Sequence, residues 1–234
     1  MNPATEPISV LLVALYRYQN FPIRILHSLL EKMDGIEPHT VFFKNQYTNA
    51  VKRPTAKEES LFRERILELQ PKMVGLSVYS PYVPIAKKLT TIVKENSSAL
   101  VMWGGIHPTL SPRSCLKHAD LVCIGEGEGA LKDLVLSLRD GKDYQKISNL
   151  WIKQNGRHQR NPLRPLIQNL DSVPFPAYAR ESFYFIGSNK ITRKDETIDD
   201  PILATMPARG CPFSCSYCVN SLLRPLYRDL GAFN

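Results

Sequence analysis

The chain has 234 residues, 43% of them hydrophobic, and a net charge of +8 from 30 Lys and Arg against 22 Asp and Glu. This apolar fraction suffices for a packed core and excludes global disorder, while the scattered basic residues favour a solubilising surface over a nucleic-acid interface. No stretch approaches the roughly 20 apolar residues of a transmembrane segment, and no basic region precedes the first apolar run, which argues against a signal peptide.

The first 140 residues alternate between short apolar runs and amphipathic stretches. Five apolar runs predict β-strands: Ile8–Leu15, His39–Lys44, Met73–Tyr79, Leu100–Trp103 and Leu121–Ile124. Between them, apolar residues at helical spacing predict helices near residues 25–33, 58–70, 85–95, 114–118 and 130–139. Strands that alternate with helices favour a parallel sheet with right-handed crossovers. We therefore expect an α/β fold, with a doubly wound, Rossmann-like, five-stranded domain over residues 8–145.

The pattern changes after residue 145. Ile147–Lys153 and a partner strand after Asn155-Gly156 predict a β-hairpin, because Asn-Gly favours a two-residue turn. Four prolines between residues 162 and 176 indicate an extended connector, and the polar residues 187–201 predict a surface loop. The apolar run Ile202–Met206 predicts a strand that leads into a cysteine-rich loop. We therefore divide the rest of the chain into a hairpin and connector over 146–200 and a third unit over 201–234.

Three of the five cysteines lie close together, at Cys211, Cys215 and Cys218, with the spacing C-x3-C-x2-C. Three such thiolates can bind three irons of a [4Fe-4S] cluster and leave the fourth iron open for another ligand. Zinc is the main alternative, but it would need a fourth ligand and usually uses paired C-x2-C halves. An odd number of cysteines without a secretion signal also indicates a reducing cytoplasm. Cys115 and Cys123, in a predicted helix and strand, are expected to be buried thiols.

The cysteine motif resembles that of the radical S-adenosylmethionine superfamily, whose signature has an aromatic residue before the third cysteine, as Tyr217 is here. The resemblance implies that Cys211, Cys215 and Cys218 ligate a [4Fe-4S] cluster and that Tyr217 contacts S-adenosylmethionine. It also implies reductive cleavage to a 5′-deoxyadenosyl radical, with an electron from a donor such as flavodoxin or ferredoxin. Residues 201–234 would then begin a radical SAM β/α barrel. Because a barrel needs on the order of 200 residues, we expect it to be incomplete and this chain alone to be inactive.

A second resemblance covers roughly residues 8–180. Trp103–Thr109, Ala119–Val122, Gly125–Glu128 and Leu170–Pro176 follow one another as in the cobalamin-binding domain and connector that precede many radical SAM enzymes. In a doubly wound sheet, ligands bind outside the carboxyl ends of the strands. We therefore expect cobalamin contacts from residues at or just after the carboxyl ends of the third, fourth and fifth strands: Ser77, Tyr79, Gly104, Gly105, His107, Gly125, Glu126 and Gly127.

Plainer explanations stand beside these assignments. The paired glycines fit an ordinary strand-to-helix turn, and the acids after the fifth strand are favoured at a helix N-terminus by the helix dipole alone. His107 suits a turn-stabilising role better than cobalt ligation. The loop Leu15–Pro22 also lacks the histidine of the Asp-x-His-x-x-Gly loop that many cobalamin proteins carry. The lower ligand of cobalt is therefore open, and a degenerate domain that binds nothing remains an alternative.

The two resemblances together imply the N-terminal portion of a cobalamin-dependent radical SAM enzyme that acts on a small-molecule or lipid-like substrate. Methyl transfer to an unactivated carbon is one reaction class, and a radical rearrangement or ring closure is another. A non-catalytic cobalamin-binding module is an alternative of a different kind. A methylthiolating enzyme is less favoured, because it would carry further cluster cysteines in its front domain, where only Cys115 and Cys123 occur.

Overall fold

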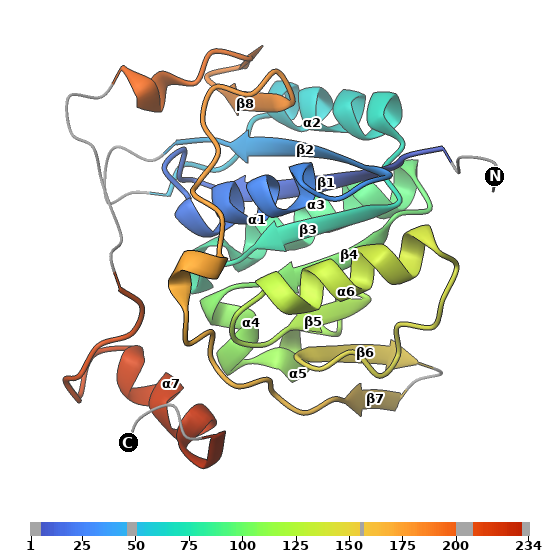
Figure 1. Cartoon of the computed structure of the whole chain (residues 1–234). Coiled ribbons are helices and arrows are strands. Elements are labelled where there is room, and N and C mark those ends of the chain that lie inside the picture. The colour runs from blue at the N-terminus through green and yellow to red at the C-terminus, as the bar shows by residue number, and fades with distance from the viewer. Residues whose placement is uncertain (1–5, 46–50, 155–156, 200–207, 231–234) are drawn as a thin grey trace.

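Five parallel strands form the centre of the fold. The computed structural model describes residues 6–45, 51–154, 157–199 and 208–230. The strands are β1 (Ile8–Leu15), β2 (Ile36–Phe43), β3 (Met73–Ser77), β4 (Leu100–Gly104) and β5 (Leu121–Cys123). They lie in the order β5-β4-β3-β1-β2, as Figure 1 shows, and every neighbouring pair is parallel. The strand order reverses beside β1, so the predicted doubly wound sheet is confirmed.

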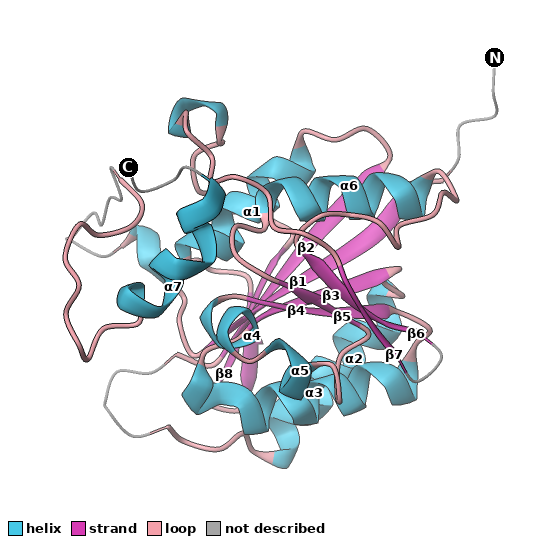
Figure 2. Ribbon diagram, turned by 90° about the horizontal axis from the view of Figure 1, so that it is seen from below, coloured by secondary structure: helices cyan, strands magenta, loops and turns pink. Residues whose placement is uncertain are grey.

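Helices cover both faces of this sheet. They are α1 (Phe21–Glu31), α2 (Ala56–Leu69), α3 (Val83–Asn96), α4 (Ile106–Leu110), α5 (Pro112–Cys115) and α6 (Glu128–Arg139). In Figure 2, α1 and α6 lie on one face, and α2, α3 and α5 lie on the other. Single 3₁₀ turns occupy Ser80–Tyr82, Leu170–Ser172, Glu196–Ile198 and Arg228–Leu230. None of the helices in the described part of the chain is long and apolar enough to span a membrane.

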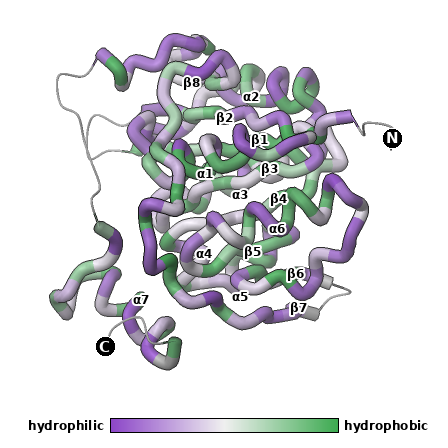
Figure 3. Tube along the Cα trace, viewed as in Figure 1, coloured by the Kyte–Doolittle hydropathy of each residue, from purple (hydrophilic) through white to green (hydrophobic). Residues whose placement is uncertain are grey.

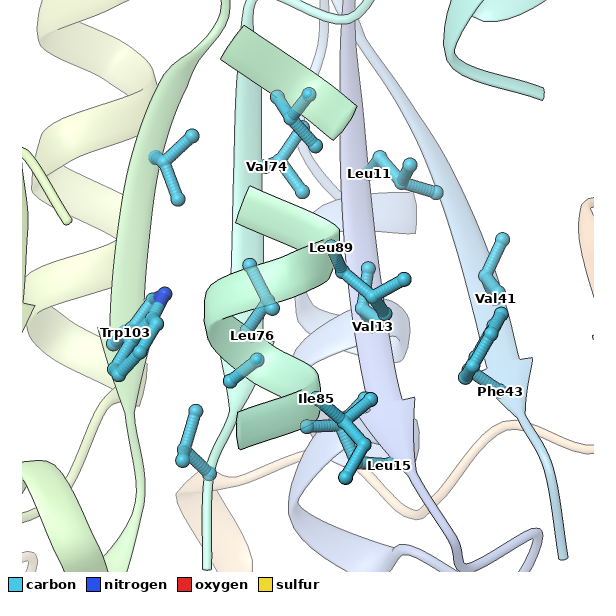
Figure 4. Close-up of a cluster of buried hydrophobic side chains, with 14 of the residues drawn as sticks. Leu11, Val13, Leu15, Val41, Phe43, Val74, Leu76, Ile85, Leu89 and Trp103 are labelled. Carbon is cyan, nitrogen blue, oxygen red and sulfur yellow. The ribbon is translucent and has the colours of Figure 1, made fainter. Parts of the chain in front are cut away.

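The alternation of side chains along β1 creates two apolar cores, one on each face. Leu11, Val13 and Leu15 pack with residues of α2 and α3, and Figure 4 shows them beside Ile85 and Leu89. The intervening residues Val10, Leu12 and Ala14 pack instead with residues of α1 and α6. Hydrophobic residues are concentrated in these central elements (Figure 3), whereas residues 188–199 are mostly polar or charged. A strand buried on both faces therefore explains the near-continuous apolar sequence of β1.

The sheet extends beyond the five predicted strands. The predicted hairpin forms as β6 (Leu150–Gln154) and β7 (Arg157–Arg160), and it joins the edge of β5 as part of the same sheet. On the other edge, β8 (Phe183–Gly187) pairs parallel to β2, and β9 (Lys190–Thr192) pairs antiparallel to β8. The described residues thus form a nine-stranded sheet. Expecting only a surface loop from residue 187 was wrong for β9, because that short strand is held by pairing with β8.

Several element ends differ from the prediction. Helix α2 begins before Glu58 because Thr55 caps it, accepting from the Glu58 amide while the Glu58 carboxylate accepts from the Thr55 amide. The short helix expected at 114–118 begins earlier, at Pro112, and α4 precedes it directly. Helix α7 (Asn220–Tyr227) follows the cysteine loop and was not predicted. The strand expected at Ile202–Met206 lies outside the described residues.

Candidate functional site

A cavity of about 730 Å³ lies at the carboxyl edge of the sheet, between α1 and the loops that follow β3, β4 and β5. Leu12, Ile23, Leu26 and Met102 supply much of its apolar lining, which α1 and two strands therefore share. The volume falls in the range of about 300–1,000 Å³ that is typical of small-molecule sites. The cavity therefore lies where a doubly wound sheet places its ligand.

Six of the eight residues predicted from strand ends line this cavity. They are Ser77, Gly104, Gly105, Gly125, Glu126 and Gly127. Ser77, only 8% exposed at the end of β3, brings a hydroxyl to the cavity wall. Tyr79 and His107 are not among the lining residues: the Tyr79 ring packs edge-on against Tyr82, and His107 Nδ1 lies 3.0 Å from Ser80 Oγ. Their role as ligand contacts therefore remains a prediction without support from the cavity.

The two paired glycines have different reasons to be glycine. Gly105 has φ +99°, and a Cβ there would lie 3.2 Å from the Val78 carbonyl oxygen, so the turn itself requires glycine. A Cβ on Gly104 would meet only the Cys123 Cβ, at an ordinary 3.6 Å. The plain turn explanation thus accounts for Gly105, whereas Gly104 leaves open space that a ligand can use.

The loop Gly125–Glu128 is held by polar contacts from several segments. The Gly125 amide donates to Thr109 Oγ1 at 3.0 Å, and Asn149 Nδ2 donates to the Glu126 carbonyl oxygen at 2.9 Å. The Ile167 amide donates to Glu126 Oε2 at 2.7 Å. These contacts tie α4, the hairpin and the connector to one loop at the cavity wall.

Arg209 bridges both acids of this loop. Its Nη1 lies 2.9 Å from Glu126 Oε1 and its Nη2 lies 2.5 Å from Glu128 Oε1. Burial would lower the pKa of Arg209, but hydrogen bonds and the charges of both carboxylates raise it. The acids are thus paired within the chain, which neither the ligand assignment nor the helix-dipole explanation anticipated. Residues 83 positions apart in the sequence leave no local signal of such a contact.

The cysteine loop approaches the same cavity. Cys211 lines it, and Cys211, Cys215 and Cys218 are all half-buried free thiols. No group of three His, Cys, Asp or Glu side chains placed to hold a metal occurs in the described ranges, so cluster ligation by these cysteines remains a prediction. Tyr217 is 91% exposed, so its ring is open to solvent.

Tyr227, at the end of α7, is a further cavity residue that the sequence did not reveal. Its ring is buried against Gly125, whose φ is +76°, and a Cβ on that glycine would collide with Tyr227 Oη. Burial raises the pKa of Tyr227 to about 12.

The remaining polar candidates have defined places. Cys115 and Cys123 are buried as predicted, and Cys123 also lines the cavity. Burial raises the pKa of Cys123 to about 12, so it is a thiol at neutral pH. Burial lowers the pKa of His107, with a smaller contribution from Lys87. None of the described residues that line the cavity is a histidine.

The sequence of this chain is similar to a family model and to several known proteins. The family model described as "B12 binding domain" matches residues 9–135. An uncharacterized methyltransferase of Pyrococcus horikoshii is 33% identical over 163 residues, which cover 67% of this chain and 33% of the relative. The anaerobic magnesium-protoporphyrin IX monomethyl ester cyclase of Rubrivivax gelatinosus is 29% identical over 170 residues, covering 68% and 29%. This chain therefore spans about a third of the length of these relatives.

A solved structure shares the fold. The cobalamin-dependent S-adenosylmethionine radical enzyme OxsB, with aqua-cobalamin bound, superposes with a TM-score of 0.59 at 20% identity. The match covers 74% of this chain and 24% of OxsB. It confirms the predicted α/β architecture of the front domain.

Proposed function

Because the chain belongs to the B12-binding domain family, we propose that its carboxyl-edge cavity binds cobalamin and that the chain is the front part of a cobalamin-dependent radical SAM enzyme. The observation that carries this proposal is the cavity itself, together with the six predicted residues that line it. The relatives support the same family, as a methyltransferase and a cyclase.

The residues present fit part of a cobalamin molecule. A cavity of about 730 Å³ matches a drug-sized ligand, and cobalamin is larger, so only part of it would be enclosed. The apolar walls from Leu12, Ile23 and Met102 suit the flat aromatic base of the nucleotide tail. Ser77 would hydrogen-bond polar atoms of the ligand, and Gly104 would let it approach the backbone of β4. With no histidine in the described lining, the proposal assigns no protein ligand to cobalt.

We extend the proposal to the cysteine loop, where Cys211, Cys215 and Cys218 would ligate a [4Fe-4S] cluster and Tyr217 would pack against the adenine of S-adenosylmethionine. When bound, these groups supply one-electron cleavage of S-adenosylmethionine, and cobalamin supplies a carrier for methyl groups. The chain's contribution is to hold the cysteine loop beside the cavity, which Cys211 itself lines.

Methyl transfer to a small molecule is the reaction we favour for the full-length enzyme. Radical ring closure is the second candidate, because the Rubrivivax relative is named as a cyclase. In either case we propose a cytoplasmic setting and a one-electron donor such as flavodoxin or ferredoxin. The substrate would contact parts that the relatives have and that this chain, at about a third of their length, does not span.

An equilibrium titration with methylcobalamin in the dark, followed by absorbance, tests the binding proposal. Gly104→Leu places a side chain in the cavity at a position with room for a Cβ, and it is expected to weaken binding at least about tenfold, as filling a ligand site does. Ser98→Leu adds the same side chain at an exposed position before the opposite end of β4 and serves as the control. A wild-type chain that binds no cobalamin, or that binds it no more tightly than the Gly104→Leu variant does, contradicts the proposal.

A further inference from the structure

The contact between Arg209 and the loop Gly125–Glu128 connects the two proposed cofactor sites. Arg209 stands two positions before Cys211, and its guanidinium bridges the carboxylates of Glu126 and Glu128. The three side chains are largely shielded from water, at 23%, 18% and 13% exposure. Ion pairs in such a setting are screened less than surface pairs, so they constrain the position of the chain that carries them.

The acids that receive Arg209 are themselves fixed in place. Glu126 uses its second carboxylate oxygen to accept from the Ile167 amide at 2.7 Å. Its carbonyl oxygen accepts from Asn149, which is buried next to β6. Glu128 is the first residue of α6, so its carboxylate sits at a helix N-terminus that favours negative charge. Arg209 therefore pairs with two carboxylates whose positions are fixed by other contacts.

A second contact holds the same segment against the same loop. The Tyr227 ring is buried beside Gly125, at the end of α7. Together the two contacts make residues 208–230 a wall of the cavity, since Ala208, Arg209, Gly210, Cys211, Leu223 and Tyr227 all line it. A ligand in the cavity therefore meets the segment that carries the cysteines.

We propose that Arg209 is a positioning residue that couples occupancy of the cavity to the arrangement of the cysteine loop. Its ion pairs complete the cavity wall, and a ligand that contacts this wall stabilises the loop in return, because such coupling is reciprocal. Arg209 also offsets the negative charge of both carboxylates at the cavity wall. The identity of the ligand rests on the function proposed above, whereas the clamp itself is a property of this chain.

Hydrogen exchange of the whole chain, with and without methylcobalamin in the dark, tests this coupling. In the wild type, methylcobalamin is expected to slow amide exchange in residues 208–218. In Arg209→Gln, exchange there should be faster without ligand, the ligand should no longer slow it, and affinity should fall at least about fivefold, the low end of typical coupling. Arg113→Gln removes the same charge from an exposed position on α5 and should behave as the wild type.

A second variant removes the partner of Arg209 in the front domain. Glu128→Gln should raise exchange in residues 208–218 as Arg209→Gln does. The double variant should be no worse than the stronger single one, because Glu128→Gln removes one of the two ion pairs that Arg209→Gln removes. Additive effects would overturn the proposal, as would a wild type that binds methylcobalamin without protecting residues 208–218. A wild type that binds no methylcobalamin overturns both the coupling and the proposed function, and the affinity measurement separates this outcome from the others.

Discussion

Two arginine contacts hold segments from the C-terminal part of the chain against the front domain. One contact is fully buried, and the other is partly exposed. Arg24 on α1 is fully buried with Asp195, at 0% side-chain exposure for both, and its guanidinium stacks on Phe42 and Tyr178 at 4.6 Å. Arg209 pairs with two acids at a cavity wall, and all three retain some exposure. The first clamp has no route by which a ligand could reach it, whereas the second borders the proposed ligand. The Arg24 contact is therefore expected to stabilise the fold alone, whereas the Arg209 contact can also respond to ligand binding.

The largest expected effect follows from breaking the buried clamp. Arg24→Met leaves Asp195 buried without its partner, and removing one member of a buried pair costs about 3–5 kcal/mol. Urea denaturation of wild type and variant gives the free energy of unfolding. Arg24→Met with Asp195→Asn should recover part of the loss, because the uncompensated charge is gone. If Arg24→Met lowered the free energy of unfolding by less than Arg209→Gln does, the proposed difference between the two arginine contacts would be contradicted.

A pH dependence should come from the same buried region. Burial, aided by Arg180, lowers the pKa of His27 to about 3, and its neutral ring contacts Thr40 Oγ1 at 2.9 Å and Ser182 Oγ at 3.2 Å. The unfolded chain takes up a proton below about pH 6.5 and the native state does not. The contribution of His27 to the free energy of unfolding is therefore fully present above pH 6.5. It falls as the pH is lowered toward 3, with a slope approaching about 1.4 kcal/mol per pH unit.

The measurement is the free energy of unfolding between pH 7.5 and 5. His27→Gln keeps a hydrogen-bonding side chain without this titration, so its curve should be flatter than that of the wild type. Parallel curves for the two proteins would show that His27 does not titrate as its surroundings require.

A smaller effect is expected where α7 meets the sheet edge. Gly125→Ala must hold a left-handed φ of +76° and displace Tyr227, whereas Gly141→Ala has a similar φ of +65° and open space around it. The backbone alone costs about 1–2 kcal/mol at each site. The excess loss at Gly125 measures the Tyr227 contact, and Tyr227→Phe should reduce it. Equal losses at both glycines would mean that Tyr227 does not pack there.

The smallest effect on stability is expected for the clamp at the cavity. Arg209→Gln should lower the free energy of unfolding by about 1 kcal/mol, the upper end of the range for exposed pairs, because the three side chains are largely but not fully shielded from water. The same variant is expected to change ligand affinity clearly, so the two readouts should diverge. A large loss of stability would make Arg209 a second structural anchor and remove the distinction between the two clamps.

The sequence predicted what local patterns determine. The five parallel strands were found because each is a short apolar run between turn residues, and the ligand edge followed from the topology of such sheets. Strand β8 was missed, although Phe183–Ile186 is a buried apolar run, because it lies in a proline-rich connector and pairs with β2 from far along the chain.

Prediction of the site residues from the sequence was limited in the same way. Ser77 and Gly104 were predicted from their positions at strand ends, and the cavity includes both. Arg209 and Tyr227 were missed because their partners lie about 80 to 100 residues away, at Glu126, Glu128 and Gly125. Contacts of this kind depend on how segments pack, which periodicity does not encode. The cysteine spacing is a strong chemical signal, and its role stays a prediction for iron analysis to test.

A crystal structure of this chain grown with saturating methylcobalamin shows whether the cavity at the carboxyl edge of the sheet binds cobalamin. We expect ligand density in the cavity, in contact with Ser77 and Gly104, with Arg209 still bridging Glu126 and Glu128. Density elsewhere on the surface, or a cavity that remains empty in those crystals, would contradict it.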